Sequence, residues 1–166
     1  MIDPSGAQVG IDYLHSLIHE GKLFRVSHMA TNVATSTGYK YLINVPAGVE
    51  LHYEAKYFAK FGGWIKATYD PAVTANGTEV VASNLKTNSP VKITSKFYAA
   101  PTATAKADAV PFYVGIPGGT GVAGTGSSGG NGERVELGLR PGNWLLEFTP
   151  YADSSDFIIN VIAYEE

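Results

Sequence analysis

Apolar residues recur at steps of three and four near the start of the chain and at every second position after residue 22. The first pattern predicts a short helix that ends at Gly21, with an apolar face made of Ile11, Leu14, Leu17 and Ile18. A helix of two to three turns is not stable alone, so this face must pack on another surface. That surface can belong to the same subunit, which makes the segment a lid, or to a partner, which makes it an anchor.

The alternation after residue 22 is that of β-strands with one buried face. The clearest case is residues 49–59, where charged and histidine side chains alternate with Val49, Leu51, Tyr53, Ala55 and Tyr57. Further strands are predicted over residues 23–29, 39–45, 63–69, 91–99, 111–116, 133–139, 143–150 and 157–164.

The segments between these strands carry the signals of loops and turns. Residues 70–90 are predicted to form an elaborated loop around the turn dipeptide Asn76-Gly77, and residues 101–109 a connector rich in Ala and Thr. Residues 117–132 have the composition of a flexible loop, and Arg140-Pro141-Gly142 predicts a tight turn.

Eight or nine short strands, one short helix and closely spaced turns predict an all-β fold. We expect an antiparallel jelly-roll-type β-sandwich with a short N-terminal helical or extended segment, and a closed barrel as the alternative. Residues 1–21 are expected to be an N-terminal docking segment and residues 22–166 a single β-sandwich domain. A domain of this length buries about 70% of its unfolded surface, so it needs neither a metal nor a disulfide.

The composition narrows the classes of function. Only 16% of the residues are charged, against a usual ~25%, so part of the surface must be uncharged, as in a protein that packs against neighbours. The 45% hydrophobic content excludes an intrinsically disordered chain. The net charge is −3 and the 12 Lys and Arg residues are scattered, so we expect no nucleic-acid partner.

Cysteine usage and the apolar segments bear on the compartment. The absence of cysteine excludes a disulfide scaffold and a cysteine-based zinc site. The first residues have no basic segment followed by an apolar run, so we expect a protein that is made in the cytoplasm and is not secreted. No stretch approaches 18 consecutive apolar residues, so we expect no membrane partner.

Two motifs resemble known sites but lack a required part. Residues 119–124 spell GxGxxG, yet further glycines and a strand follow, where a dinucleotide site needs a helix. His15 and His19 have the spacing of a metal-binding pair on a helix, yet the glutamate of a zinc protease and a predictable third ligand are missing. We therefore predict no cofactor, no metal, no catalytic residues and no enzymatic activity.

The aromatic residues, ten Tyr, seven Phe and two Trp, suit packing in a core or an interface. A carbohydrate platform is the alternative, and the aromatics that we single out for it are Tyr53, Tyr57, Trp64 and Tyr69. A lectin-like site should show aromatics and carboxylates that converge on one end of the sandwich, whereas a structural protein should show apolar, uncharged subunit faces.

Several short motifs, in their order along the chain, resemble a family of tailed-phage virion proteins, the jelly-roll capsid decoration (auxiliary or cement) proteins. The residues that carry the resemblance are His19-Glu20-Gly21-Lys22 followed by Phe24, then His52, Asn84, a Gly-rich loop before Glu136, Leu137 and Leu139, and Tyr164-Glu165 in an apolar last strand. Each motif is short, and together they span most of the chain.

The resemblance implies a non-enzymatic protein of the virion. Such a protein binds the outside of the lattice of the major capsid protein, commonly as a homotrimer, and lies on the capsid surface. The candidate residues for the contact with the capsid or with another subunit are Ile11, Tyr13, Leu14, Leu17 and Ile18. The alternative function is that of a receptor- or carbohydrate-binding β-sandwich, a head fibre or a lectin-like module, with a surface glycan as its partner.

Overall fold

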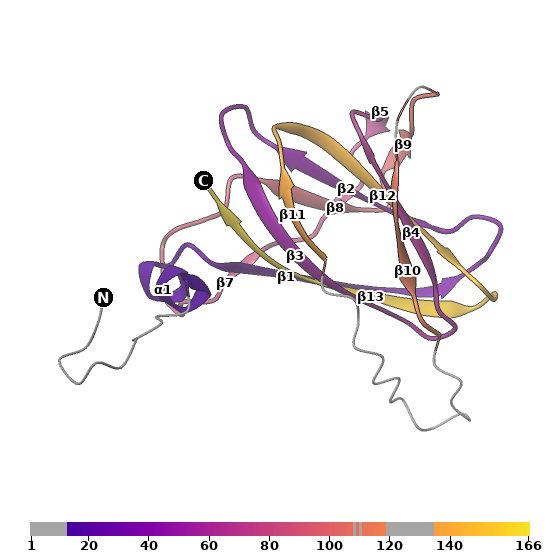
Figure 1. Cartoon of the computed structure of the whole chain (residues 1–166), viewed down its shortest axis with the longest axis horizontal. Helices are drawn as coiled ribbons and strands as arrows, with labels where there is room; N and C mark the ends of the chain where they lie inside the picture. Colours follow the sequence, from indigo (N-terminus) through magenta and orange to yellow (C-terminus); the bar gives the residue numbers. More distant parts are fainter. Residues whose placement is uncertain (1–12, 108, 110, 119–134) are drawn as a thin grey trace, which may run out of the picture.

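The computed structural model describes residues 13–107, 109, 111–118 and 135–166 (Figure 1). One helix and thirteen strands lie in this part of the chain. The elements are, in chain order, α1 (Tyr13–Glu20), β1 (Phe24–Val33), β2 (Tyr39–Val45), β3 (Leu51–Ala59), β4 (Gly63–Tyr69), β5 (Ala72–Ala75), β6 (Thr78–Glu79), β7 (Ser83–Asn84), β8 (Lys96–Ala99), β9 (Thr102–Thr104), β10 (Phe112–Ile116), β11 (Val135–Leu139), β12 (Gly142–Pro150) and β13 (Ser155–Glu165).

Two antiparallel sheets form the sandwich. The first sheet has the strand order β11-β3-β13-β1-β7, and the second sheet has the order β10-β4-β12-β2-β8-β6. The four long strands of each sheet, β11-β3-β13-β1 and β10-β4-β12-β2, have the order of an eight-stranded jelly roll built from two Greek keys. The predicted jelly-roll-type sandwich is therefore confirmed. The closed-barrel alternative is wrong, because the strands form separate sheets.

The core lies between the inner faces of these sheets, where the period-two pattern places large apolar side chains. Phe148 of β12 stacks on Phe157 of β13, with ring centroids 4.0 Å apart. The hydroxyl groups of Tyr53 and Tyr57 are hydrogen-bonded to each other at 2.7 Å inside this core. Burial raises the pKa of both Tyr53 and Tyr57 well above the ordinary value, so both hydroxyls stay neutral.

The chain between β4 and β10 leaves the jelly roll and covers part of the second sheet's outer face. Leu42, Leu145 and Thr68 lie side by side on that face, and each is at most 1% exposed. The cover includes β9, because Lys40 Nζ, on the same face, donates to the carbonyl of Ala103 at 2.8 Å. The prediction of a loop over residues 70–90 and a connector over 101–109 is therefore incomplete, since β5, β6, β7 and β9 lie there.

Several predicted boundaries hold and others shift. The strands predicted over residues 39–45 and 63–69 have these bounds in the structure. β1 continues to Val33 through an irregularity in its pairing with β13, where Asn32 has a φ of 55°. β8 is shorter than the strand predicted over residues 91–99.

The two predicted turns connect elements in different ways. Gly77 has a φ of 89°, and a Cβ there would lie 2.2 Å from the Ala99 carbonyl oxygen, so the Asn76-Gly77 turn requires glycine. It does not make a hairpin, because β5 pairs with β9 and β6 with β8. The turn at Pro141-Gly142 leads from β11 in the first sheet to β12 in the second. None of the helices in the described residues is both long and apolar enough to span a membrane.

Candidate functional site

Residues 19–24 join α1 to the first sheet. Gly21 ends the helix in a left-handed conformation (φ 71°), and the Lys22 N–H donates to the Leu17 carbonyl at 2.9 Å. This is a Schellman motif. Glycine is required here, because a Cβ at position 21 would also lie 2.5 Å from Ser89 Oγ. The end of the helix predicted at Gly21 is confirmed.

Asn84, one of the residues that carry the family resemblance, holds the other side of this joint. Its amide donates to the carbonyls of Gly21 (2.7 Å) and Val91 (3.1 Å), and its side-chain oxygen accepts the N–H of Lys86. The Lys86 ammonium in turn donates to the His19 carbonyl at 2.7 Å. These motif residues therefore have a structural role: they fix the direction in which α1 leaves the sheet.

The structure places four of the five predicted contact residues on α1. Leu17 is buried, Leu14 and Ile18 are half-buried, and Tyr13 is exposed. Ile11 lies outside the described residues. The helix packs on its own subunit through Leu17, as expected for a lid. Contact of these side chains with a capsid stays a prediction.

An aromatic cluster fastens α1 to the end of β13. The Tyr13 hydroxyl donates to Glu166 Oε1 at 3.0 Å, and its ring meets the ring of Tyr164 edge-on with centroids 5.7 Å apart. Tyr164 stacks on His52 at 4.4 Å, and His52 Nε2 lies 3.3 Å from Glu166 Oε2. The hydrogen bond to the Glu166 carboxylate raises the pKa of Tyr13. The helix thus lies at one end of the first sheet's outer face, close to the C-terminus (Figure 1).

Glu165 clamps β13 to the segment before β8. Its carboxylate accepts the Thr94 N–H at 3.0 Å, the Thr94 hydroxyl at 2.9 Å and the Ser95 N–H at 2.6 Å. Burial raises the pKa of Glu165, but these hydrogen bonds outweigh burial and leave that pKa lowered. Because Thr94 and Ser95 donate to a side chain rather than to a neighbouring strand, β8 begins only at Lys96.

Acidification should remove the stabilisation that Glu165 supplies. A carboxyl whose folded-state pKa is lowered stabilises the fold above its ordinary pKa of 4.5, and the contribution is lost as the pH falls through the lowered value. We expect Glu165→Gln to reduce the free energy of unfolding at neutral pH by about 1–3 kcal/mol. The same variant should flatten the pH dependence of stability below the ordinary pKa of 4.5, which urea titrations at each pH measure.

The matched control is Glu79→Gln, which removes a carboxylate paired with the exposed Lys96 at the edge of the second sheet. An exposed pair of this kind contributes about 0–1 kcal/mol, so the control should leave the pH profile close to that of the wild type. Equal profiles for wild type and Glu165→Gln would contradict the clamp.

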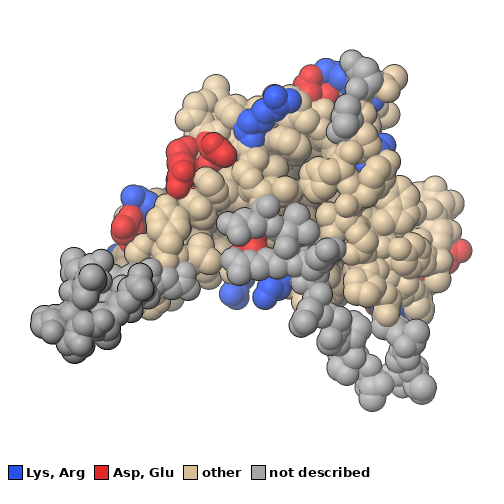
Figure 2. Space-filling model, viewed as in Figure 1, with Lys and Arg blue, Asp and Glu red and all other residues tan. Residues whose placement is uncertain are grey.

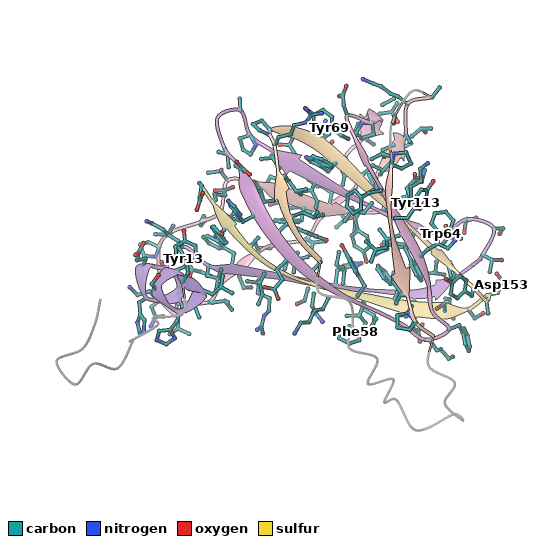
Figure 3. All side chains as sticks on the ribbon, in the orientation of Figure 1. Tyr13, Phe58, Trp64, Tyr69, Tyr113 and Asp153 are labelled. Carbon is teal, nitrogen blue, oxygen red and sulfur yellow. The ribbon has the colours of Figure 1, made fainter. Side chains whose placement is uncertain are left out.

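Three apolar side chains form a row across the outer face of the first sheet. Met29 on β1 lies opposite Ile158 on β13, which lies opposite Phe58 on β3. Met29 is 56% exposed and Phe58 39% exposed, and Ile158 is half-buried. In Figure 3, Phe58 lies below β13. We call these three residues the apolar row; within the described part of the chain they stay accessible.

A groove of about 300 Å³ lies next to the apolar row on the same face. Phe58 forms one side of it, and Arg25, Lys56, Glu54 and Asn160 provide polar groups and charges of both signs. The face therefore presents an apolar end beside a mixed polar strip. This arrangement resembles a protein–protein contact, in which apolar residues are bordered by polar ones.

The outer face of the second sheet carries a pair of aromatic residues, which we call the aromatic platform. Trp64 on β4 and Tyr113 on β10 have ring centroids 5.7 Å apart, and Tyr113 is 62% exposed. Gly115 lies opposite Trp64, and a Cβ there would meet no atom within 4 Å, so the space beside the indole is open. Figure 3 shows both rings beside β10, away from Phe58.

Polar groups border the aromatic platform. Thr149 lies opposite Trp64 across β4 and β12. In the next row of the same face, Glu147 Oε1 lies 3.5 Å from Lys40 Nζ, and Glu147 Oε2 lies 3.4 Å from Lys66 Nζ. The platform therefore combines ring faces with a hydroxyl and a paired carboxylate.

The structure separates the four aromatics that the sequence analysis singled out. Tyr53 and Tyr57 are buried in the core, so they carry no ligand-binding surface. Tyr69 contacts Trp144, and the Arg140 guanidinium lies 3.8 Å from the centroid of the Tyr69 ring. Of the four, Trp64 is the one that pairs with a strongly exposed aromatic residue, Tyr113.

Sequence analysis missed Met29, Phe58 and Tyr113. A signal for the first two was present, because each is an apolar residue at a position where the alternation assigns the solvent face. The register between three strands that are distant in sequence then brings Met29 and Phe58 to either side of Ile158. Tyr113 had no such signal in the sequence, because only the pairing of β10 with β4 places it beside Trp64.

Side chains suited to catalysis or metal binding are scattered over the described residues. No group of three or more His, Cys, Asp or Glu side chains that could hold a metal ion occurs among them. His15 and His19 do meet on the surface of α1, with their Nε2 atoms 2.9 Å apart. The GxGxxG motif lies outside the described residues.

Comparisons of the sequence with models of protein families and with curated proteins find no match.

Proposed function

We propose that the chain is a non-enzymatic virion structural protein that decorates and stabilises the outer surface of a phage capsid, where it binds the lattice of the major capsid protein as a homotrimer. The apolar row carries this proposal, because apolar side chains grouped on an open sheet face are typical of a surface that another protein covers. The jelly-roll fold supports it by analogy, since capsid proteins of viruses use this fold.

The distribution of charge also supports an assembly surface. Figure 2 shows Lys, Arg, Asp and Glu side chains in small separate groups, with broad uncharged areas between them. With 16% charged residues, the chain has few charged groups that would lose their water in a contact. Interface centres in protein complexes are likewise depleted of charged residues.

The apolar row and α1 lie at opposite ends of the same outer face. Tyr164, which contacts α1, and Ile158, which belongs to the row, are six residues apart on β13, which is about 20 Å along a strand. Tyr13 at one end and the row at the other can therefore contribute to one contact area. The proposed contact area thus includes Tyr13, which the sequence analysis predicted, and the apolar row, which it missed.

The test is binding to capsids of the phage that encodes the chain, prepared without this protein. We expect the wild-type protein to sediment with these particles and to be a trimer by sedimentation velocity. The double variant Met29→Lys with Phe58→Lys should fold but bind at least tenfold more weakly, because it puts two charges into an apolar contact.

Tyr113→Lys is the matched control, since it introduces the same charge at an exposed aromatic position on the opposite sheet. It should bind capsids like the wild type. Failure of the wild-type protein to bind the capsids would contradict the proposed function. Unchanged binding by the double variant would show that the apolar row is not the contact.

The aromatic platform favours a second function, that of a glycan-binding module. The open space beside Trp64 and the exposed Tyr113 ring fit a sugar ring stacked on an aromatic face, and Thr149 and Glu147 supply hydrogen-bonding groups nearby. A receptor-binding protein of this kind would bind a surface glycan through the second sheet.

Glycan-array binding by the isolated protein tests this second function. Binding should be lost in Trp64→Ala with Tyr113→Ala and retained in Met29→Lys with Phe58→Lys. The two pairs of variants separate the functions, because each pair leaves the other surface unchanged. An array without any bound glycan would exclude the second function.

A further inference from the structure

We infer that His15 and His19 form a chelating site for a divalent transition-metal ion of the copper and nickel class on the surface of α1. Their Nε2 atoms lie 2.9 Å apart, and the ring centroids 4.6 Å apart. Without the ion, one Nε2–H donates to the other Nε2. Both side chains are exposed, so the donor ring can carry its proton on Nδ1 instead, and both Nε2 lone pairs can then turn toward a common point in solvent. This inference is independent of the proposed function, and it replaces the sequence-based prediction of no metal, because the two nitrogens lie close enough to bind one ion without a third protein ligand.

The separation of the two nitrogens fits two neighbouring coordination positions. An imidazole nitrogen binds such an ion at about 2.0–2.1 Å. Two nitrogens 2.9 Å apart therefore subtend an angle of about 90° at the ion. Square-planar and octahedral ions have ligands at this angle, whereas a tetrahedral zinc site needs a wider one. The remaining coordination positions would be filled by water, since both histidines face solvent.

The helix holds the pair at the required spacing. Positions 15 and 19 are four residues apart, which places their side chains on one face, one turn above the other. The end of α1 is fixed by Gly21 and by the contact of Lys86 with the His19 carbonyl, so position 19 is anchored in the fold. An ion bound to both rings would link successive turns of the helix.

The two other histidines of the chain are held in different surroundings. His28 Nδ1 is hydrogen-bonded to the Tyr41 hydroxyl at 2.9 Å, and burial lowers the pKa of His28. His52 stacks on Tyr164. In the described structure their partners are tyrosines and a carboxylate rather than a second histidine, so neither provides a chelating pair.

Calorimetric titration of the full-length protein with NiCl₂ tests the inference directly. We expect one ion per chain, with affinity increasing from Mn²⁺ through Co²⁺ and Ni²⁺ to Cu²⁺. His15→Gln and His19→Gln should each weaken Ni²⁺ binding at least tenfold, because a single imidazole loses the chelate. The helical signal in the circular dichroism spectrum should increase when Ni²⁺ binds and should return to its starting value when EDTA removes the ion.

A respaced variant, His19→Gln with Glu20→His, is the matched control. It keeps two histidines on α1 but places them five residues apart, on different faces, and should bind Ni²⁺ as weakly as the single variants. Equal Ni²⁺ affinity for the wild-type and respaced proteins would overturn the inference. So would Ni²⁺-dependent dimerisation with half an ion per chain, since the ligands would then come from two copies.

Discussion

Phe157→Ala should lower the free energy of unfolding by about 3–5 kcal/mol, the largest effect that we expect from a single substitution. Phe157 is almost fully buried at the centre of the sandwich, where it stacks on Phe148 at 4.0 Å and on Tyr57 at 6.2 Å. Removal of the ring leaves a cavity between two sheets whose backbones are fixed by their pairing. Urea titration should show the loss, and the melting temperature should fall by about 6–20 °C.

Phe58→Ala provides the comparison within the same residue type. Phe58 lies on the opposite face of the first sheet and is 39% exposed, so its truncation should cost less than about 1.5 kcal/mol. The urea dependence of unfolding should keep the same slope in both variants, as expected when the folded and unfolded states are otherwise unchanged. Similar losses for the two variants would mean that the core is not centred where the structure places it.

Leu145→Ala should destabilise the protein by about 2–4 kcal/mol, although Leu145 does not face the sandwich core. Its side chain points to the outer face of the second sheet and is 0% exposed, beside Leu42 and Thr68. The loss arises because the chain between β4 and β10 covers this row and forms a second, smaller apolar layer. Thermal and urea unfolding measure the effect.

Val81→Ala is the control for this second layer. Val81 also lies in the chain between β4 and β10, which we call the excursion, but its side chain is exposed. The Val81→Ala substitution should therefore change the stability by no more than about 0.5 kcal/mol. If Leu145→Ala were equally mild, the excursion would not be packed on the second sheet.

The eight long strands were predictable because each has one face toward the core. Apolar residues therefore recur at every second position along these strands. Tyr53 and Tyr57 illustrate this, since both were placed by alternation on the buried side of residues 49–59 and both are buried. The left-handed glycine at position 21 was equally local, because the helix pattern stops there. Both features are determined by residues that are close together in the sequence, so a sequence pattern can predict them.

Leu42 and Leu145 show where such reasoning stops. Both interrupt the alternation with an apolar residue on the outward side, and the part of the chain that covers them comes from the excursion between β4 and β10. No local pattern indicates that residues near Ala103 will return to this face. The short strands of this segment have two to four residues, too few to show a period of two, and their partners are distant in the sequence.

The candidate surfaces also combine features that the sequence predicts with features that only the fold shows. The apolar face of α1 was visible as a helical period, but the contact of Tyr13 with Glu166 joins residues 153 positions apart. The apolar row exists only in the register of β1, β13 and β3. Sequence identifies single apolar residues on a polar face, and only the sheet shows that three of them are neighbours.

The place of β13 in the first sheet has a consequence for biosynthesis. β13 pairs with both β1 and β3, so two strands have a main partner that the ribosome makes much later. Between Ala59 and Ser155 the ribosome adds 155 − 59 = 96 residues, which takes about 5–20 s at ordinary rates of translation. The first sheet therefore forms after this delay, and a nascent chain arrested before residue 155 is expected to stay protease-sensitive although most of its strands have been made.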